Sequence, residues 1–438
     1  MLEGPEFCRF VRWHDRCYNR PMAPNPLHLP QDSLPSPPAT PPFDLLDRVR
    51  VLDLTTSIAG PYATLLLADF GAEVVKLERP GGGDDARHWG PPFLDGDSLW
   101  FLSVNRNKRS VALDTTNEAG RAVFEDLVRA ADVVVTNQVP RVQTKLAMDP
   151  ATLQALKPDL IVATVTGFGL TGARRDAPCY DLIAEGYSGV MDLTGEADAP
   201  PQKVGTPAAD LLAGHDLALT VAAALVRKGR TGQGAVVDVS MVESMTRFMT
   251  PRLASYLGSG DLPRRSGARD SVIAVYQVFD TADEPLTLGL GNDAIWRRFW
   301  DALGQPARGD AAAHATNAGR RGDRAAIVAE IQDRLLTRSR AEWLALFETH
   351  KVPAGPILRL DEIAADAGLR ERGFLYALPR DGKPAAAQVN TGVYIDGAPN
   401  SPRTAPPDLG ADGDAVMLDW LGYDDDRRRA VRDSGALG

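Results

Sequence analysis

The segment at residues 205–216, GTPAADLLAGHD, places two aspartates and a histidine at the start of an apolar stretch. A carboxylate there can attack an electrophilic carbon, and a carboxylate beside an imidazole can move protons. Asp210 can equally cap the N-terminus of the helix that follows. His215 and Asp216 fall in the next turn, where we expect packing or solvated side chains. The segment alone leaves a nucleophilic role and a capping role open for Asp210.

A glycine run, RPGGGDDARHW at residues 79–89, is a second candidate, for phosphate binding. It lacks the G-x-G-x-x-G spacing and does not follow the first strand, so it does not fit a dinucleotide site. The sequence also has no Walker A motif, no G-x-S-x-G motif and no histidine pair spaced for a metal. We therefore expect no redox cofactor and no metal site.

A basic cluster, NRNKRS at residues 105–110, stands out in an acidic protein. Arg79 and Lys145 lie at the ends of other predicted elements. Such a cluster is either a solvated charged loop or a binding site for a polyphosphorylated ligand. The local sequence does not separate the two interpretations.

The elements that must position these residues alternate between β-branched runs and amphipathic segments. A buried strand is predicted at 48–55, followed by a helix that Pro61 opens and Gly71 closes, and by a strand at 72–80. The alternation continues with helices at 118–130, 150–156 and 210–228 and strands at 132–137, 160–169 and 235–241. This pattern predicts an α/β fold with a parallel sheet and helices on both faces.

The pattern of apolar and polar residues changes after residue 258, and the new pattern predicts a second, smaller domain. The stretch SVIAVYQVFDTADEPLTLGLGN predicts a hairpin that turns at TADE, and helices follow at 293–303, 322–337 and 340–350. We expect a disordered, proline-rich extension at 1–43 and a large ligand-binding domain at 44–225 that residues 380–438 complete. The small domain then spans 271–350, between linkers at 226–270 and 351–379.

Composition limits the partners and the compartment. The 438 residues carry 48 basic and 58 acidic side chains, for a net charge of −10, which makes nucleic acid an unlikely partner. Three scattered cysteines form no disulfide framework and no zinc pattern, as is usual in a reducing cytoplasm. No run of 18 apolar residues and no signal peptide is present, so we expect a soluble cytoplasmic protein without a membrane partner.

Taken together, five stretches resemble the family III CoA-transferases, from about residue 46 to the C-terminus. They are VLDLTTSIAGPYATLLLADFGAEVVKLERPGGGDDARHWGPPF, SVNRNKRSVALD, VTGFGLTGARRDAPCYDLIAEGYSGVM, AADLLAGHDLALTVAAALVRKGRTGQGAVVDVSMVES and VPAGPILRLDEI. The family includes formyl-CoA, carnitine and succinyl-CoA:glutarate CoA-transferases, and α-methylacyl-CoA racemase shares its fold. The resemblance implies a Rossmann-like parallel-sheet large domain, a smaller α+β domain and an interlocked homodimer.

The resemblance also implies a reaction. CoA passes between two carboxylic acids through one aspartate, which corresponds here to Asp210, by way of a mixed anhydride and an aspartyl-CoA thioester. The small-molecule partners are then an acyl-CoA donor and a carboxylic acid acceptor, with CoA as substrate and no tightly bound cofactor. A glycine-containing loop supplies oxyanion donors in this family, but the sequence does not place that loop.

Several CoA-binding positions of the family carry over to this sequence. Arg79 matches the arginine at the nucleotide end of CoA, Leu113 an apolar contact, and Asn137 the asparagine of a conserved turn. Lys145 stands where arginine is common and keeps the charge without the bidentate fork. Trp89, Lys108 and Arg109 match in residue type only, with loop support as the equal alternative.

The acceptor and the exact reaction are indicated more weakly. Tyr180, in the Tyr180-Asp181 pair 29 residues before Asp210, replaces the catalytic histidine of the racemases, and tyrosine titrates near pH 10, which favours transfer over racemisation. Ile58 replaces a glutamine of the oxalate enzymes. The motifs GDDARHWGPPF, SVNRNKRS and VYQVFDTADE most resemble those of the enzymes that use succinate and glutarate. The distal carboxylate of such an acceptor would need a cation, for which the candidates are Arg264, Arg265 and Arg269. An acyl-CoA racemase or isomerase and a non-catalytic CoA-binding paralogue are the alternatives.

Overall fold

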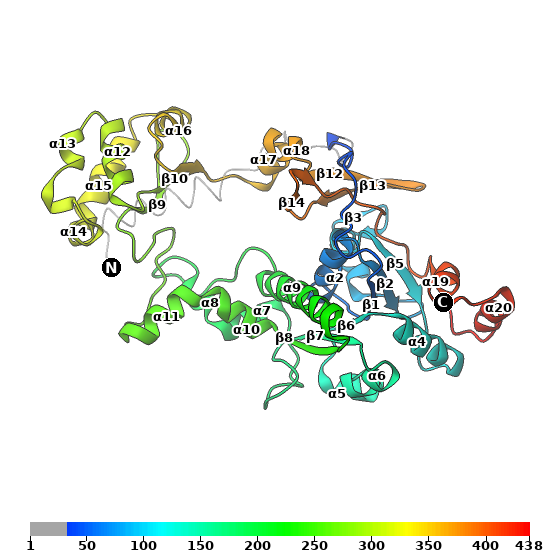
Figure 1. The fold of residues 1–438 in the computed structure, drawn as a ribbon. Helices are drawn as coiled ribbons and strands as arrows, with labels where there is room; N and C mark the ends of the chain where they lie inside the picture. The colour runs from blue at the N-terminus through cyan, green and yellow to red at the C-terminus, as the bar shows by residue number, and fades with distance from the viewer. Residues whose placement is uncertain (1–32) are drawn as a thin grey trace.

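The structure, a computed structural model, describes residues 33–438 and consists of two lobes joined by two connecting segments (Figure 1). The larger lobe surrounds a parallel sheet, and the smaller lobe lies at the far end of the molecule. One connection runs through α10 (Met241–Phe248) and α11 (Thr250–Ser259). The other runs back from β11 (Ala354–Pro356) to α17 (Leu360–Ala365).

The large lobe is built on six parallel strands in the order β5-β2-β1-β6-β7-β8. Their bounds are β5 Lys108–Ala112, β2 Glu73–Glu78, β1 Arg50–Asp53, β6 Val133–Thr136, β7 Ile161–Thr166 and β8 Ala235–Ser240. The chain adds strands on one side of β1, through β2 and β5, and then on the other side, from β6 to β8. The order therefore reverses between β1 and β6, and such a reversal opens a crevice at the carboxyl ends of the strands. The predicted parallel α/β architecture is confirmed.

Apolar helix faces cover both sides of this sheet. On one side α2 (Ala59–Asp69) and α9 (Ala208–Thr231) pack on alternate strand residues, and on the other side α4 (Glu118–Ala130) and α19 (Gly413–Leu421) do so. A Cβ on Gly214 of α9 would lie 2.7 Å from the carbonyl oxygen of Ala59, so only glycine allows the two helices to approach this closely. This contact fixes the start of α9 against the start of α2.

Among the described residues, α9 is the one helix long and apolar enough to cross a membrane by length and composition, with a mean hydropathy of 1.5 over 18 residues. The helix packs against α2, β7, β8 and α10. Core helices of soluble proteins pass the same test, so this is weak evidence for a membrane span.

The smaller lobe has its own antiparallel sheet in the order β11-β10-β9. The predicted hairpin is confirmed: β9 (Tyr276–Phe279) pairs with β10 (Leu286–Gly289). The predicted helices correspond to α12 (Asp293–Ala302), α15 (Arg324–Leu335) and α16 (Arg340–Thr349). Buried aromatic side chains of α12 and α16 and aliphatic side chains of α15 form a separate core with the sheet. The segment between α12 and α15 holds α13 (Pro306–Gly309) and α14 (Asn317–Gly322).

Two predicted boundaries need correction. The linker predicted at 226–270 contains the end of α9, β8 and α10, and β8 pairs with β7 along the whole edge of the large sheet. Residues 1–32 of the predicted extension lie outside the described residues. Residues 33–43 pack against the segment at residues 370–400, so this part of the extension is ordered. The amide of Ala377 donates to the carbonyl of Pro35 at 2.9 Å, and Phe43 is buried.

The remaining elements connect or cover these parts. In the large lobe they are η2 Asp85–His88, β3 Phe93–Leu94, β4 Asp97–Ser98, α3 Leu99–Ser103, α5 Pro140–Lys145, α6 Pro150–Leu156, α7 Asp181–Ser188, α8 Val190–Leu193 and α20 Asp425–Asp433. After the second connection come α18 Ala367–Glu371, the hairpin β12 Leu375–Arg380 with β13 Lys383–Val389, and the pair β14 Tyr394–Ile395 with β15 Ala398–Pro399.

Candidate active site

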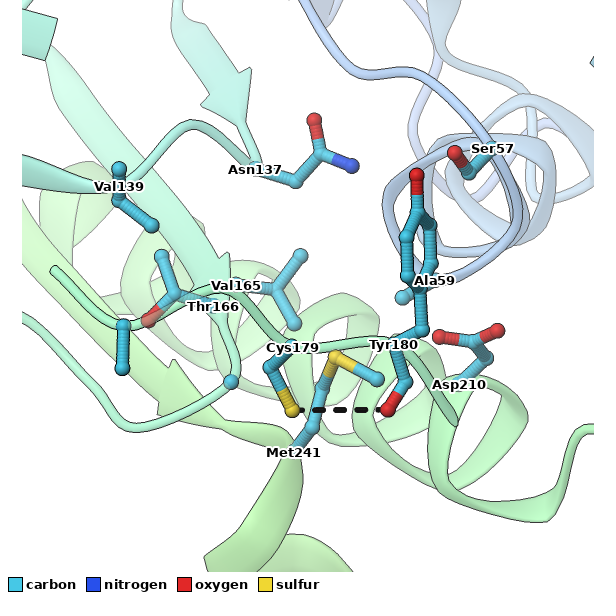
Figure 2. A pocket seen from close by; sticks show the side chains of 12 residues that line it. Ser57, Ala59, Asn137, Val139, Val165, Thr166, Cys179, Tyr180, Asp210 and Met241 are labelled. Carbon is cyan, nitrogen blue, oxygen red and sulfur yellow. Dashed lines mark hydrogen bonds between the residues drawn. The ribbon is translucent and has the colours of Figure 1, made fainter. Parts of the chain in front are cut away.

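A narrow cavity of about 80 Å³ opens at the carboxyl ends of the central strands, where the strand order reverses (Figure 2). Its walls come from the segments that follow β1, β6, β7 and β8 and from the first turn of α9. The lining residues are Ser57, Ala59, Asn137, Val139, Val165, Thr166, Gly167, Ala177, Cys179, Tyr180, Asp210 and Met241. The cavity has room for a reacting group, whereas a whole CoA molecule must lie mostly outside it.

Asp210 is a lining residue in the first turn of α9, but it does not cap the helix. α9 begins at Ala208, and the cap is made by Asp181, whose Oδ1 accepts the amides of Ala209 at 2.8 Å and Asp210 at 3.3 Å. The capping role considered for Asp210 is therefore wrong, and its own carboxylate is left to face the cavity. Burial and the negative charge of Asp181 raise the pKa of Asp210 from 3.8 to about 7.

A third carboxyl lies behind the first two. Glu185 on α7 is fully buried, and its Oε2 accepts the amide of Val204 at 2.9 Å, while Oε1 has no hydrogen-bond partner within the described chain. Burial raises the pKa of Glu185, and the nearby carboxyl of Asp181 raises it further. No motif in the sequence pointed to Glu185, whose position behind Asp181 depends on α7 packing against α9.

The loop between β1 and α2 is held rigidly at the cavity rim. Asn137 clamps it from β6: its Nδ2 donates to the carbonyl of Thr56 at 2.7 Å, and its Oδ1 accepts the amide of Thr56 at 3.2 Å. Ser57 adopts a left-handed φ of 70°, and its amide donates to buried Asp84 at 2.9 Å. Because no side chain caps α2, the first amides of this helix remain available where Ala59 meets the cavity.

Four of the predicted CoA-binding residues lie after carboxyl ends of strands. Arg79 follows β2 and is exposed, in an ion pair with Asp85 at 2.8 Å. Leu113 follows β5 and is buried, Asn137 follows β6, and exposed Lys145 ends α5. The half-buried indole of Trp89 packs edge-on against Trp100, in the loop after β2.

Lys108 does not reach the crevice. It is fully buried, and its Nζ donates to Asp53 at 3.1 Å, to the carbonyl of Pro61 at 2.8 Å and to Asn105 at 2.8 Å. Burial, the first cause, lowers the pKa of Lys108 to about 8. The structure therefore gives Lys108 a role in the core and leaves no surface of it for a ligand.

Arg109 also lies elsewhere than predicted. It sits near the amino end of β5, opposite Val75, and pairs with Asp419 at 2.8 Å and Glu73 at 3.6 Å. The crevice lies at the other end of the sheet. The basic cluster at 105–110 is therefore not a phosphate site, because most of it is strand and buried loop with internal partners.

The predicted substrate-binding residues separate into two places. Tyr180 lines the cavity and is 66% exposed, and Asp181 lies directly behind Asp210. Ile58 is buried beneath the rim with Leu65, outside the cavity lining. Arg269 lines a different cleft in the smaller lobe, which shares no lining residue with the cavity of Asp210. Within one chain, Arg269 is thus not brought to the candidate active site.

The remaining candidates also have partners elsewhere. His215 packs edge-on against Tyr62, and Asp216 forms an ion pair with Arg247, so the AGHD motif takes no part in the cavity. Arg265 pairs with Asp192 at 3.0 Å. Residues 33–438 contain no cluster of metal-ligating side chains.

The site contains one thiol that sequence reasoning passed over. Cys179 lines the cavity, and its Sγ donates to the carbonyl of Tyr180 at 3.5 Å (Figure 2). Burial and the charge of Asp210 raise the pKa of Cys179 to about 11, so the thiol stays protonated near neutral pH. Its position directly before Tyr180 was the available signal.

Comparison with known proteins agrees with this geometry. The family model described as CoA-transferase family III matches residues 46–413. A succinate–glutarate CoA-transferase of Agrobacterium fabrum is 36% identical over 83% of this chain and 93% of its own length, and a succinyl-CoA:glutarate CoA-transferase of Mus musculus is 33% identical over 90% of each. The crystal structure of a CaiB/BaiF family protein from Brucella suis superposes with a TM-score of 0.75 at 33% identity, covering 86% of this chain and 99% of that one. The chain belongs to CoA-transferase family III and is a CoA-transferase, an enzyme that uses CoA thioesters as substrates.

Proposed function

We propose that the enzyme moves CoA between dicarboxylic acids of the succinate and glutarate class, with Asp210 as the nucleophile. The observation that carries the proposal is a carboxylate with no capping duty, placed in a small cavity at the reversal of strand order. Relatives named for succinate, glutarate and mesaconate support the acceptor class. Burial and the Asp181 carboxylate behind it make Asp210 more basic and hence more nucleophilic once it is deprotonated.

The proposed reaction begins when an Asp210 oxygen attacks the thioester carbon of the donor. The C–S bond breaks, leaving a mixed anhydride and CoA thiolate. The thiolate then attacks the Asp210 carbonyl carbon, which releases the donor carboxylate and leaves an aspartyl-CoA thioester. The acceptor carboxylate attacks that thioester to form a second anhydride and free thiolate. Attack of the thiolate on the acceptor acyl carbon gives the new acyl-CoA and restores Asp210.

Each attack puts negative charge on a carbonyl oxygen, which needs fixed donors. We assign this role to the backbone amides at the start of α2, at Ala59 and Gly60. The uncapped helix end and the loop held by Asn137 and Asp84 support the assignment, since donors that are fixed beforehand need no reorganisation during the reaction. The narrowness of the cavity favours exclusion of water, which would otherwise hydrolyse the intermediates.

For CoA itself we propose a path along the carboxyl ends of β2 and β6, with contacts from Arg79, Asn137 and Lys145. Arg79 and Lys145 supply positive charge for phosphate groups. Arg79 and Asn137 directly follow β2 and β6, Lys145 ends the helix that comes after β6, and Trp89 lies in the loop after β2. Leu113 is buried in the core of the large lobe, so we assign its side chain no contact with CoA.

The proposal is tested by mass spectrometry of protein incubated with succinyl-CoA and then treated with hydroxylamine. We expect a hydroxamate on the peptide that contains Asp210, and no modification in the variant Asp210→Asn. Asp216→Asn is the matched control, since this aspartate lies on the same helix but pairs with Arg247 outside the cavity. Modification of another residue, or none with any acyl-CoA donor, would contradict the mechanism.

We also propose that two chains interlock as a homodimer, with the smaller lobe as a separate domain. A group of large apolar side chains is exposed on the adjoining helices α7, α9, α10 and α11: Leu182, Ile183, Tyr187, Leu219, Val226, Phe248, Leu253, Tyr256 and Leu257. Exposed apolar surface of this extent typically marks an interface. Two separate connections join the lobes, so each chain has the ring-like path that an interlocked pair requires (Figure 1). A mass near 47 kDa by light scattering, rather than twice that value, would contradict the dimer.

We propose a cytoplasmic location for the enzyme, on the basis of its few cysteines, which form no disulfide framework. Fractionation of cells that express the untagged chain tests this location.

A further inference from the structure

The smaller lobe contains a second cleft, of about 380 Å³, that within one chain shares no lining residue with the cavity of Asp210. It lies between the loop before β9, the strand β9 and the start of α15, far from the large sheet in Figure 1. The lining residues are Arg269, Gln277, Arg321, Gly322, Arg324, Ala325 and Val328. Three of these seven are arginines, in a protein whose net charge is −10.

The three guanidinium groups face the cleft without a carboxylate of their own. Within residues 33–438, none of them has an acidic group within ion-pair distance, and Nη2 of Arg324 is buried without a hydrogen-bond partner. Burial, Arg269 and Arg321 all lower the pKa of Arg324, while Asp270 opposes them. Asp270 is already engaged, by Arg252 at 2.8 Å and by the amides of the two residues that follow Ser271.

The floor of the cleft supplies neutral polar groups. Gln277 is only 9% exposed, and its Oε1 has no hydrogen-bond partner within the described chain. The 12-residue helix α15 begins at Arg324, and its preceding residue, Asp323, does not cap it, because the Asp323 carboxylate pairs with His314 at 2.7 Å. The first amides of α15 are therefore open at the end where the helix dipole is positive.

Three like charges and an open helix end together destabilise an empty cleft and stabilise one that holds negative charge. We propose that this cleft binds a small organic anion with at least two negative charges, of the organic phosphate or polycarboxylate class. Arginines suit both classes because the planar fork of a guanidinium matches phosphate and carboxylate oxygens. The site is separate from the cavity of Asp210, and the proposal does not depend on the identity of the acceptor.

The test is calorimetric titration of the full chain with pyrophosphate and, separately, with citrate. The double variant Arg321→Gln/Arg324→Gln removes two charges from the cleft, and Arg297→Gln removes one exposed charge of the same lobe outside it. We expect one such site per chain and at least a tenfold loss of affinity in the double variant, with the affinity of Arg297→Gln unchanged. Binding of pyrophosphate alone assigns the phosphate class, and binding of citrate alone assigns the carboxylate class.

Hydrogen exchange locates the bound anion independently. Amides at residues 324–328 should exchange more slowly with anion present in the wild type and not in the double variant. CoA transfer without added anion should proceed at the same rate in both proteins. The transfer assay therefore tests the transferase mechanism independently of anion binding. No binding of either anion up to 10 mM, or equal binding by the double variant, would overturn the proposal.

Discussion

Two groups of acidic side chains in the large lobe have opposite charged neighbours, and the pKa values of Asp53 and Asp210 move in opposite directions. Asp53 ends β1 and contacts Lys108, and Asp84 lies in the loop after β2 and contacts Lys76. Both lysines are fully buried. Lys108 and Lys76 oppose the effect of burial and hold the pKa of Asp53 well below its ordinary value. Asp210, in the first turn of α9, has another carboxylate as its charged neighbour, and burial together with that charge raises its pKa to about 7. The difference shows that the charged neighbours of a carboxylate shielded from solvent decide the direction in which its pKa moves.

The largest effect should come from removing the uncompensated carboxylate. Asp210→Asn keeps the size of the side chain but cannot form the anhydride, so kcat for CoA transfer should fall at least about 10⁴-fold. Steady-state assays with succinyl-CoA and a panel of dicarboxylates measure the loss. Residual transfer above a tenth of the wild-type rate would place the nucleophile elsewhere.

The same variant should also be more stable than the wild type at neutral pH. Because the pKa of Asp210 is raised in the folded state, the folded protein binds the proton more tightly than the unfolded chain. The contribution of Asp210 to stability is thus fully present below pH 4 and is lost as the pH rises through about 7. Denaturant unfolding at pH 5 and pH 8 should show the advantage of Asp210→Asn growing with pH, and a constant difference would contradict the raised pKa.

Removing the lysine that compensates the charge of Asp53 should instead destabilise the folded protein. Lys108→Met leaves Asp53 without its nearer cation and should lower the free energy of unfolding by about 3–5 kcal/mol. Lys145→Met, at an exposed lysine, should change it by less than about 0.5 kcal/mol. Urea denaturation followed by circular dichroism measures both. Adding Asp53→Asn to Lys108→Met should recover part of the loss, whereas an additive further loss would show that the pair does not interact.

A smaller effect should follow from removing the charge behind the nucleophile. Asp181→Asn keeps an oxygen that can cap α9 but removes the negative charge, so the pKa of Asp210 should fall. Transfer requires the deprotonated form, so the midpoint of the pH profile of kcat should move from near 7 to lower pH. An unchanged midpoint would show that burial alone sets this pKa.

The smallest effects distinguish the two ends of the sheet. Arg79→Gln, at the carboxyl end of β2, should raise the KM for succinyl-CoA about tenfold with little change in kcat. Arg109→Gln, at the amino end of β5, should leave the KM unchanged, because its partners are Asp419 and Glu73. Equal effects of the two substitutions on KM would mean that CoA lies along a different path from the one proposed.

The sequence sufficed for the elements with strong periodicity. The β-branched runs around Val133 and Ile161 and the apolar helix after Asp210 appear as predicted, because a strand buried on both faces needs continuous apolar residues. The local sequence left the cluster at 105–110 open between a charged loop and a phosphate site, whereas residues 108–110 of it belong to strand β5. Adjacent residues of a strand point to opposite faces, so Lys108 enters the core while Arg109 reaches the surface.

The sequence by itself determined the α/β class and the family, since these depend on periodicity and on motifs that are local in the chain. Tertiary structure alone decided which charges have partners. Asp181 and Glu185 lie 29 and 25 residues before Asp210, and only the packing of α7 on α9 brings the three carboxyl groups together. Burial and charge neighbours determine reactivity through space, and the order of residues along the chain does not specify them.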